Sequence, residues 1–131
     1  MDVIRRNTDY AMRLMSGLAR NYKKNLISAR QLAKDFDVSY ELSCKLLQKL
    51  AAARLVKSTM GVNGGFELAK APEEISLYQI IEAVQGDIRL NRCVLCPESC
   101  PNSDICGISK RLVDLQNYIE DYLKKITLNN L

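Results

Sequence analysis

The chain has 131 residues, of which 47% are hydrophobic and 26% are charged, and its formal net charge is +4. This composition is enough for a hydrophobic core and excludes an intrinsically disordered or collagen-like chain. No apolar run reaches the roughly 18–20 residues that cross a bilayer, and the charged start is not typical of a secretory signal, so we expect a cytoplasmic protein. Histidine is absent, which excludes it as a general base and as a metal ligand.

The charge is distributed unevenly along the chain. Residues 1–72 contain 13 Lys and Arg against 6 Asp and Glu, whereas residues 73–131 contain 6 basic against 9 acidic residues. A basic half joined to a mildly acidic half is typical of a protein in which one part binds a polyanion such as nucleic acid. Ordinary surface charge is the alternative, and composition alone does not decide between the two.

Three amphipathic helices are predicted in the basic half. The first spans about residues 8–22, the second begins at Ser28, and the third follows an N-cap at Ser39 and continues to about Arg54. Ser28 and Gln31 have the spacing of a capping box, in which each side chain binds a backbone N–H group near the other residue. The residues predicted to point inward are Ala11, Leu14, Met15, Leu18, Tyr22, Ala29, Leu32, Ala33, Phe36, Leu42, Leu46, Leu47 and Leu50.

A β-hairpin and two further helices are predicted next. Residues 55–59 and 66–69 are the expected strands, and Asn63-Gly64 between them predicts a turn because both residues tolerate a positive φ. Ser76 and Gln79 form a second capping box that opens a short helix with Leu77, Ile80, Ile81 and Val84 inward, and Gly86 predicts its end. Residues 87–106 show no periodicity, which inside a compact domain is typical of a functional or disordered segment.

The last predicted helix spans about residues 108–126. Its apolar residues follow a spacing of four and three, as in the seam of a coiled coil: Ile108, Leu112, Leu115, Ile119, Tyr122 and Ile126. This pattern favours dimerisation through the helix, although the helix could also pack within its own subunit.

Together these elements predict a mainly α fold with a small β-hairpin, which is a winged helix-turn-helix followed by a long C-terminal dimerisation helix. We expect a DNA-binding domain over residues 1–72, a connecting helix over 73–86, a cysteine loop over 87–107, and a dimerisation helix and tail over 108–131.

The predicted winged helix-turn-helix favours double-stranded DNA as the partner. Its third helix would enter a major groove, and its outward side chains are expected to be Tyr40, Glu41, Ser43, Cys44, Lys45, Gln48 and Lys49. Arg5, Arg6, Ser28 and Lys57 are candidates for phosphate contacts, and Asn63 and Gly64 at the hairpin tip are candidates for the minor groove or the backbone. For any single residue a solvated helix face is an equally good interpretation, but the combined pattern favours DNA.

Four thiols within fourteen positions predict a metal site or a redox site. Cys93, Cys96, Cys100 and Cys106 are separated by two, three and five residues. In a cytosolic protein such a cluster argues against a disulfide scaffold, and ligation by thiolates alone selects an iron–sulfur cluster or zinc. The single-run spacing favours a 2Fe–2S or 4Fe–4S cluster over zinc, with thiol–disulfide switching as a third possibility. Cys44 stands apart, and its simplest role is that of a half-buried apolar residue.

Several motifs resemble those of the Rrf2 family of bacterial winged-helix regulators. They are Thr8-Asp9-Tyr10-Ala11, the hairpin segment Gly61–Phe66, the segment Ile75–Gly86, and the cysteine loop followed by a long helix. The resemblance implies a homodimer that binds a near-palindromic operator and an iron–sulfur cluster held by three loop cysteines and a fourth ligand. Cys100 and Cys106 match the last cysteine pair of the family. The fourth ligand would be Cys96, or Asp9 of one subunit reaching the cluster of its partner.

The sequence therefore predicts a transcriptional regulator, repressor or activator, whose affinity for DNA is controlled by an iron–sulfur cluster. A cluster-free or zinc-bound thiol-redox repressor is the alternative, and a small iron–sulfur electron-transfer protein is a more distant one. We expect no enzyme activity, because the sequence contains no nucleophile–base pair, flavin motif or dinucleotide fingerprint.

Overall fold

The computed structural model describes residues 2–91, 98, 100–102 and 104–131. The described part contains α-helices, short 3-10 helices and one two-stranded antiparallel sheet. The elements are α1 (Arg6–Arg20), α2 (Ala29–Asp35), α3 (Tyr40–Ala52), β1 (Val56–Thr59), β2 (Gly65–Leu68), η1 (Pro72–Glu74), α4 (Leu77–Gln85), α6 (Gly107–Lys125) and η3 (Leu128–Asn130). This arrangement confirms the predicted mainly α fold with a winged helix-turn-helix and a long C-terminal helix.

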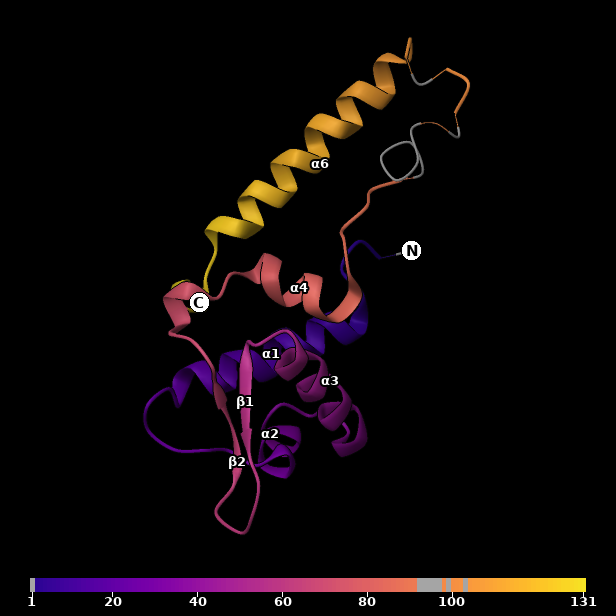
Figure 1. Cartoon of the computed structure of the whole chain (residues 1–131). Coiled ribbons are helices and arrows are strands. Elements are labelled where there is room, and N and C mark those ends of the chain that lie inside the picture. Colours follow the sequence, from indigo (N-terminus) through magenta and orange to yellow (C-terminus); the bar gives the residue numbers. More distant parts are fainter. Residues whose placement is uncertain (1, 92–97, 99, 103) are drawn as a thin grey trace.

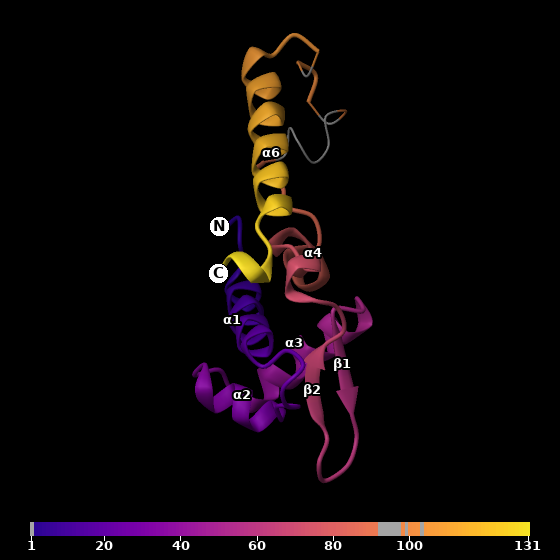
Figure 2. The same cartoon turned by 90° about the vertical axis from the view of Figure 1, so that its left-hand side faces the viewer.

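The molecule consists of a compact head and one projecting helix. Figure 1 shows α1, α2, α3 and the β1–β2 hairpin packed together, with α4 lying across α1 and α3. We call these elements the head. Helix α6 runs away from the head, and the view turned by 90° in Figure 2 shows the same separation. Within the described residues, no helix combines the length and apolarity needed to cross a membrane.

Local capping interactions set most helix boundaries as predicted. Ser39 Oγ accepts a hydrogen bond from the N–H of Leu42 at 3.2 Å, so α3 begins at Tyr40. At the start of α4, Ser76 Oγ accepts from the N–H of Gln79 at 3.2 Å, and Gln79 Oε1 accepts from the N–H of Ser76 at 2.8 Å. Gly86 ends this helix with a φ of 84°. Both the second capping box and the glycine stop are thus confirmed.

The first capping box forms only in part. Ser28 Oγ accepts from the N–H of Gln31 at 3.1 Å, as expected. The side chain of Gln31, however, donates to Asp35 Oδ1 at 2.7 Å instead of binding the backbone of Ser28. The prediction for Gln31 is therefore wrong, because its side chain is directed toward Asp35, one helical turn further on, and its Oε1 does not accept from the N–H of Ser28.

The core lies between α1, α3, α4 and the base of the hairpin. The predicted inward residues occupy it, and the residues at most 2% exposed include Leu14, Met15, Leu18, Leu32, Leu46, Leu47, Leu50, Ile80 and Ile81. Burying an aliphatic side chain of this size contributes about 1.5–3 kcal/mol to folding. The contacts come from both halves of the sequence, since Ile75, Val84 and Leu128 belong to the same cluster.

The hairpin turn differs from the prediction in its mechanism. Strands β1 and β2 pair from Val56–Leu68 to Thr59–Gly65, and five residues connect them. Neither Asn63 nor Gly64 has a positive φ; Gly61 does, at 107°. Gly64 is required for another reason, because a Cβ there would collide with the backbone carbonyl of Thr59. The turn is thus a longer loop and not a two-residue Asn-Gly turn.

Helix α6 has two faces of different environment. Ser109, Gln116 and Leu123 repeat every seven residues and are buried against the rest of the chain. On the outer side, Ile108, Leu115, Tyr118 and Tyr122 are 71%, 46%, 69% and 56% exposed. We call these four residues the outer stripe. The helix is therefore not packed wholly within its own subunit, and half of the predicted seam faces solvent.

The C-terminal tail returns to the head. The N–H of Leu77 donates to the carbonyl of Ile126 at 2.9 Å, and the N–H of Leu128 donates to the carbonyl of Ile75 at 3.0 Å. Lys124 lies 4.6 Å from the ring centroid of Tyr78 on α4. Burial, assisted by Glu120 and Glu82, raises the pKa of Tyr78 above its ordinary value. The C-terminal end of α6 is therefore held against α4.

Candidate functional site

The turn between α2 and α3 sets the orientation of α3, which is the predicted reading helix. Asp37 has a φ of 52°, and the N–H of Val38 donates to the carbonyl of Ala33 at 3.0 Å, which closes a tight turn after α2. The buried Val38 then anchors the turn in the core. This leaves Tyr40, Glu41, Lys45 and Gln48 exposed along one side of α3, as predicted. A helix presented in this way has the geometry of the second helix of a helix-turn-helix.

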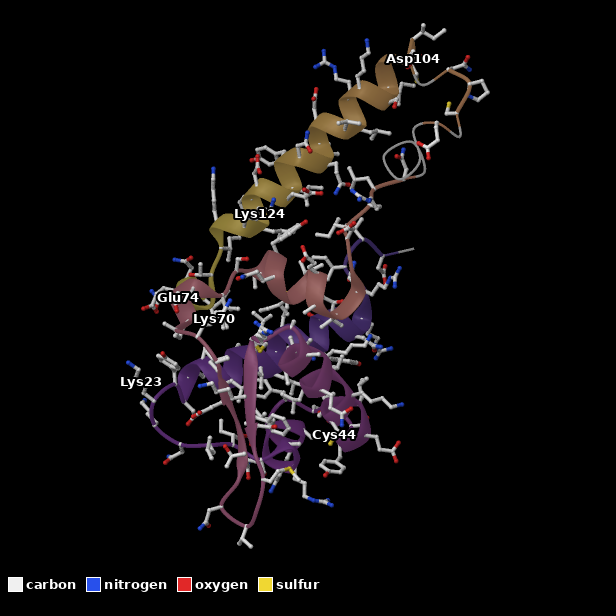
Figure 3. The ribbon with its side chains drawn as sticks, in the orientation of Figure 1. Lys23, Cys44, Lys70, Glu74, Asp104 and Lys124 are labelled. Carbon is white, nitrogen blue, oxygen red and sulfur yellow. The ribbon has the colours of Figure 1, made fainter. Side chains whose placement is uncertain are left out.

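Ser43 and Cys44 of α3 are less exposed than the other residues that were predicted to point outward. Ser43 was expected to point outward, but it is fully buried, and its Oγ has no hydrogen-bond partner among the described residues. The prediction is wrong because Ser43 lies at the edge of the apolar face, next to Leu46 and Leu47 along the helix. Cys44 is half-buried and packs against the core, and Figure 3 shows it on the lower part of the head.

A basic pocket lies on one flank of the reading helix. Lys49 Nζ donates to the carbonyl of Val84 at 3.2 Å, so this lysine points toward the end of α4. Arg5, Arg6 and Lys49 line one pocket with a volume of about 330 Å³. Arg6 Nε donates to the hydroxyl of Tyr10 at 2.7 Å. The fold thus brings Lys49 to the same pocket as Arg5 and Arg6, which are far from it in the sequence.

A polar groove lies between α2 and the hairpin tip. The backbone of Ile27 pairs with that of Phe66 through hydrogen bonds of 3.1 and 2.7 Å, which fixes the hairpin beside the start of α2. The groove has a volume of about 730 Å³ and is lined by Ser28, Asn63 and Gly64 together with Asn21, Lys24, Asn25 and Gln31. Three of the predicted contact residues, Ser28, Asn63 and Gly64, therefore share one groove. Lys57 lies outside this groove and is exposed on β1, opposite Glu67 in the strand register.

The predicted cysteine site is described only in part. Cys100 and Cys106 are free thiols and are half-buried, and Cys106 is the N-cap residue of α6. Cys93 and Cys96 lie outside the described residues. Within the described ranges, no group of three or more Cys, His, Asp or Glu side chains is arranged to hold a metal ion. Asp9 lies on α1, where its carboxylate pairs with Arg13 at 2.8 Å.

The entrance of the cysteine loop is held on α6 by one buried glutamine. Gln116 is 3% exposed, and its Oε1 accepts a hydrogen bond from the N–H of Leu90 at 3.1 Å. Its Nε2 donates to the carbonyl of Ile88 and to Glu120 Oε1. The buried side chain of Ile88 packs with Ile81 and Leu123 at the same place. Both ends of the loop are therefore attached to α6.

A second glutamine joins the end of α4 to the start of α1. Gln85 Oε1 accepts from the N–H of Arg5 at 2.9 Å and from the hydroxyl of the buried Thr8 at 2.7 Å, and its Nε2 donates to the carbonyl of Val3. Sequence reasoning missed both glutamines, because their partners are 26 or more residues away along the chain. It also missed Arg30, which lies 4.3 Å from the ring centroid of Tyr40. No local pattern signals such contacts.

Comparison with known proteins gives a consistent result over nearly the whole chain. The sequence profile of the Rrf2 family, described as iron-dependent transcriptional regulators, matches residues 4–131. The HTH-type transcriptional regulator NsrR of Halalkalibacterium halodurans is 30% identical over 125 residues, which are 95% of this chain and 86% of that protein.

Solved structures show the same similarity. CymR of B. subtilis, described as the global cysteine regulator, has a TM-score of 0.84 at 23% identity, and the match covers 99% of this chain and 95% of that one. The oxidized form of Staphylococcus aureus CymR has a TM-score of 0.77 at 27% identity, with 99% and 94% covered.

Proposed function

Because the chain belongs to the Rrf2 family of transcriptional regulators, we propose that it is a homodimeric DNA-binding regulator controlled by an iron–sulfur cluster in the cysteine loop. The observation that carries the proposal is that the loop carrying the cysteines starts at the end of α4 and ends at the N-cap of α6. The loop therefore joins the DNA-binding part to the helix with the outer stripe. We assign DNA binding to residues 1–72, the cluster to 87–107 and dimerisation to 108–131. Since its target is DNA, we expect the protein in the cytoplasm.

The exposed side of α3 supports contact with base edges in a major groove. Glu41 accepts from cytosine, and Lys45 and Gln48 suit purine edges. The basic pocket of Arg5, Arg6 and Lys49 lies on one flank of α3, and the polar groove with Ser28 and Asn63 lies at the hairpin. Charged and polar groups beside α3 and at the hairpin suit the phosphate backbone that borders a groove. Lys57 adds a further cation on β1.

The outer stripe of α6 supports a homodimer. A projecting helix with four large, exposed apolar side chains on one side is unfavourable in water, and a second copy of the same helix would cover it. Two heads related by a twofold axis would then bind the two halves of a near-palindromic operator.

The donor set of the loop fits an iron–sulfur cluster. Cys100 and Cys106 are free thiols without a disulfide, and thiolates are the preferred ligands of such clusters. We propose Cys93, Cys100 and Cys106 as ligands and Cys96 as the fourth. Asp9 of the partner subunit is the alternative, and it would first have to leave its ion pair with Arg13. When bound, the cluster would supply a centre that nitric oxide, oxygen or iron shortage can damage.

The hydrogen bonds of two glutamines provide a route from the loop to the reading helix. Gln116 fixes the backbone of Ile88 and Leu90 on α6, and Gln85, three residues before Ile88, binds the first turn of α1. Lys49 joins α3 to the adjacent carbonyl of Val84. A change in the shape of the loop would therefore change the position of α3. A shift of about 1–3 kcal/mol in DNA affinity is sufficient for regulation.

A cluster-free thiol switch is the second candidate. Cys100 and Cys106 are free and half-buried, and a relative 27% identical to this chain has been solved in an oxidized form. Zinc bound by the same thiols is a variant of this candidate. An electron-transfer protein or an enzyme has less support, because the relatives described above are named as regulators.

Anaerobic purification tests the proposal directly. We expect a brown protein with near-stoichiometric iron and sulfide, which becomes colourless in Cys100→Ser and Cys106→Ser variants. A duplex selected on the wild-type protein from a random pool should bind with an affinity that differs about 5–150-fold between cluster-loaded and cluster-stripped protein. A colourless protein that carries zinc, or one whose affinity depends only on thiol oxidation, would contradict the cluster.

The fourth ligand is decided by a matched pair of variants. If Cys96 is the ligand, Cys96→Ser loses the cluster and Asp9→Ala retains it. The opposite result would assign the position to Asp9 of the partner subunit.

A further inference from the structure

Arg30 and Tyr40 form a contact between the two helices of the helix-turn-helix. Arg30 is the second residue of α2, and Tyr40 is the first residue of α3. The guanidinium carbon of Arg30 lies 4.3 Å from the centroid of the Tyr40 ring, which is within the range of a cation–π interaction. Both residues are exposed, and Tyr40 retains 43% of its accessible surface. The pair therefore lies on the surface that the proposed function assigns to DNA.

The backbone on both sides of this contact is fixed. The hydroxyl of Ser39 caps α3 just before Tyr40, and the hydroxyl of Ser28 caps α2 two residues before Arg30. The tight turn at Asp37 sets how the two helices meet. The aromatic ring thus has a defined position, and it provides a flat surface on which the guanidinium rests.

The N–H groups of Arg30 are available to a ligand. In the described part of the chain its guanidinium makes no hydrogen bond or ion pair, although Arg13 and Arg89 each pair with a carboxylate. A stacked guanidinium binds the ring through its face and keeps its donors at its edge. A planar fork of donors held in this way suits the two oxygens of a phosphate.

We propose that Arg30 binds a DNA backbone phosphate while it remains stacked on Tyr40, so that the two residues act as one unit in DNA recognition. The inference rests on the proposed DNA-binding function and adds a residue to it. A phosphate is favoured over a base edge because Arg30 belongs to the helix that crosses the backbone, whereas α3 enters the groove. Binding of the phosphate would also hold the Tyr40 ring against the bases.

The test uses the full-length protein and the selected duplex, with affinity measured over a range of salt concentrations. Arg30→Ala is expected to weaken binding about tenfold and to reduce the salt slope by about one for each head, because a phosphate contact is lost. Arg30→Lys should keep the slope and lose part of the affinity. Lys70→Ala is the control for loss of an exposed cation, since Figure 3 shows Lys70 close to Glu74, at the end of the hairpin opposite its tip.

Variants of Tyr40 test whether the two residues act as a unit. Tyr40→Phe keeps the ring and should weaken binding less than Tyr40→Leu, which removes the ring. The double variant Arg30→Ala/Tyr40→Leu should lose much less than the product of the two single losses. A multiplicative loss, or an Arg30→Ala variant that binds like the Lys70→Ala control, would overturn the inference. A wild-type protein that binds no duplex at all would instead overturn the proposed function.

Discussion

At the scale of single residues, adjacent side chains on one helix differ in burial because they point in different directions from the helix axis. Ser43 and Cys44 are adjacent on α3, yet Ser43 is fully buried and Cys44 is only half-buried. The hydroxyl of Ser43 has no partner among the described residues, which is unfavourable because a buried hydroxyl loses its hydrogen bonds to water. This residue therefore lowers the stability of the head without contacting the proposed DNA surface.

Ser43→Ala is expected to raise the free energy of unfolding by about 1 kcal/mol, since it removes a buried polar group without a partner. DNA affinity should not change. Urea denaturation and duplex binding measure the two effects. Ser39→Ala is the matched control, because loss of the cap of α3 should lower stability by about 1 kcal/mol. If Ser43→Ala is as destabilising as Ser39→Ala, its hydroxyl has a partner that we have not identified.

At the scale of elements, the start of the cysteine loop is attached to α6 by one side chain. This side chain forms hydrogen bonds with the backbone of the loop, as a neighbouring strand would do in a sheet. The amide oxygen of Gln116 accepts from the N–H of Leu90, and its NH2 group donates to the carbonyl of Ile88 and to Glu120 Oε1. An apolar residue at this buried position would leave both backbone groups unpaired. The position of the loop entrance therefore depends on this amide together with the packing of Ile88.

Gln116→Met keeps the length of the side chain and removes the amide. We expect it to lower the free energy of unfolding by about 1–3 kcal/mol, since buried backbone groups lose their partners. Hydrogen exchange at Leu90 should become faster. Gln48→Met serves as the control, because Gln48 is exposed on α3 and its change should stay within about 0.5 kcal/mol. Equal effects of the two substitutions would show that the amide of Gln116 contributes little.

The elements also show what could be predicted from the sequence. The box of Ser76 and Gln79 and the stop at Gly86 were predictable because the interacting groups are within a few residues of each other. Gln31 was mispredicted because its side chain is directed toward Asp35, one turn away, and not back toward the N–H of Ser28. Gly64 was identified as a turn residue, but its reason, the close approach of the Thr59 carbonyl, depends on the hairpin as folded. The pairs Gln85–Thr8 and Arg30–Tyr40 depend on how helices cross, which periodicity does not determine.

At the scale of the whole molecule, the outer stripe of α6 is the surface through which we expect two subunits to associate. A single subunit exposes Ile108, Leu115, Tyr118 and Tyr122 along a helix that projects from the head. The N-terminal residues Val3 and Ile4 extend this apolar surface, since they line one pocket with Tyr118 and Tyr122. The dimer stays a prediction, which this exposed apolar surface favours.

Leu115→Glu is expected to convert the dimer into monomers at micromolar concentration, because it places a charge in the centre of the proposed interface. Sedimentation velocity measures the change. Val113→Glu is the control, since Val113 is 37% exposed and points to a different side of α6. A wild-type protein that sediments as a monomer, or equal effects of both substitutions, would exclude the outer stripe as the dimer interface.

The return of the tail to the head has a practical consequence for dissecting the protein. Leu128 belongs to the same core cluster as Leu14 and Leu47, and its backbone is paired with that of Ile75. A fragment cut after residue 72 would leave the inner surfaces of α1 and α3 in contact with water. Deleting only the last five residues would open the same core from the other side. Separate expression of the two functions therefore requires a permuted or linked chain that keeps this terminal segment.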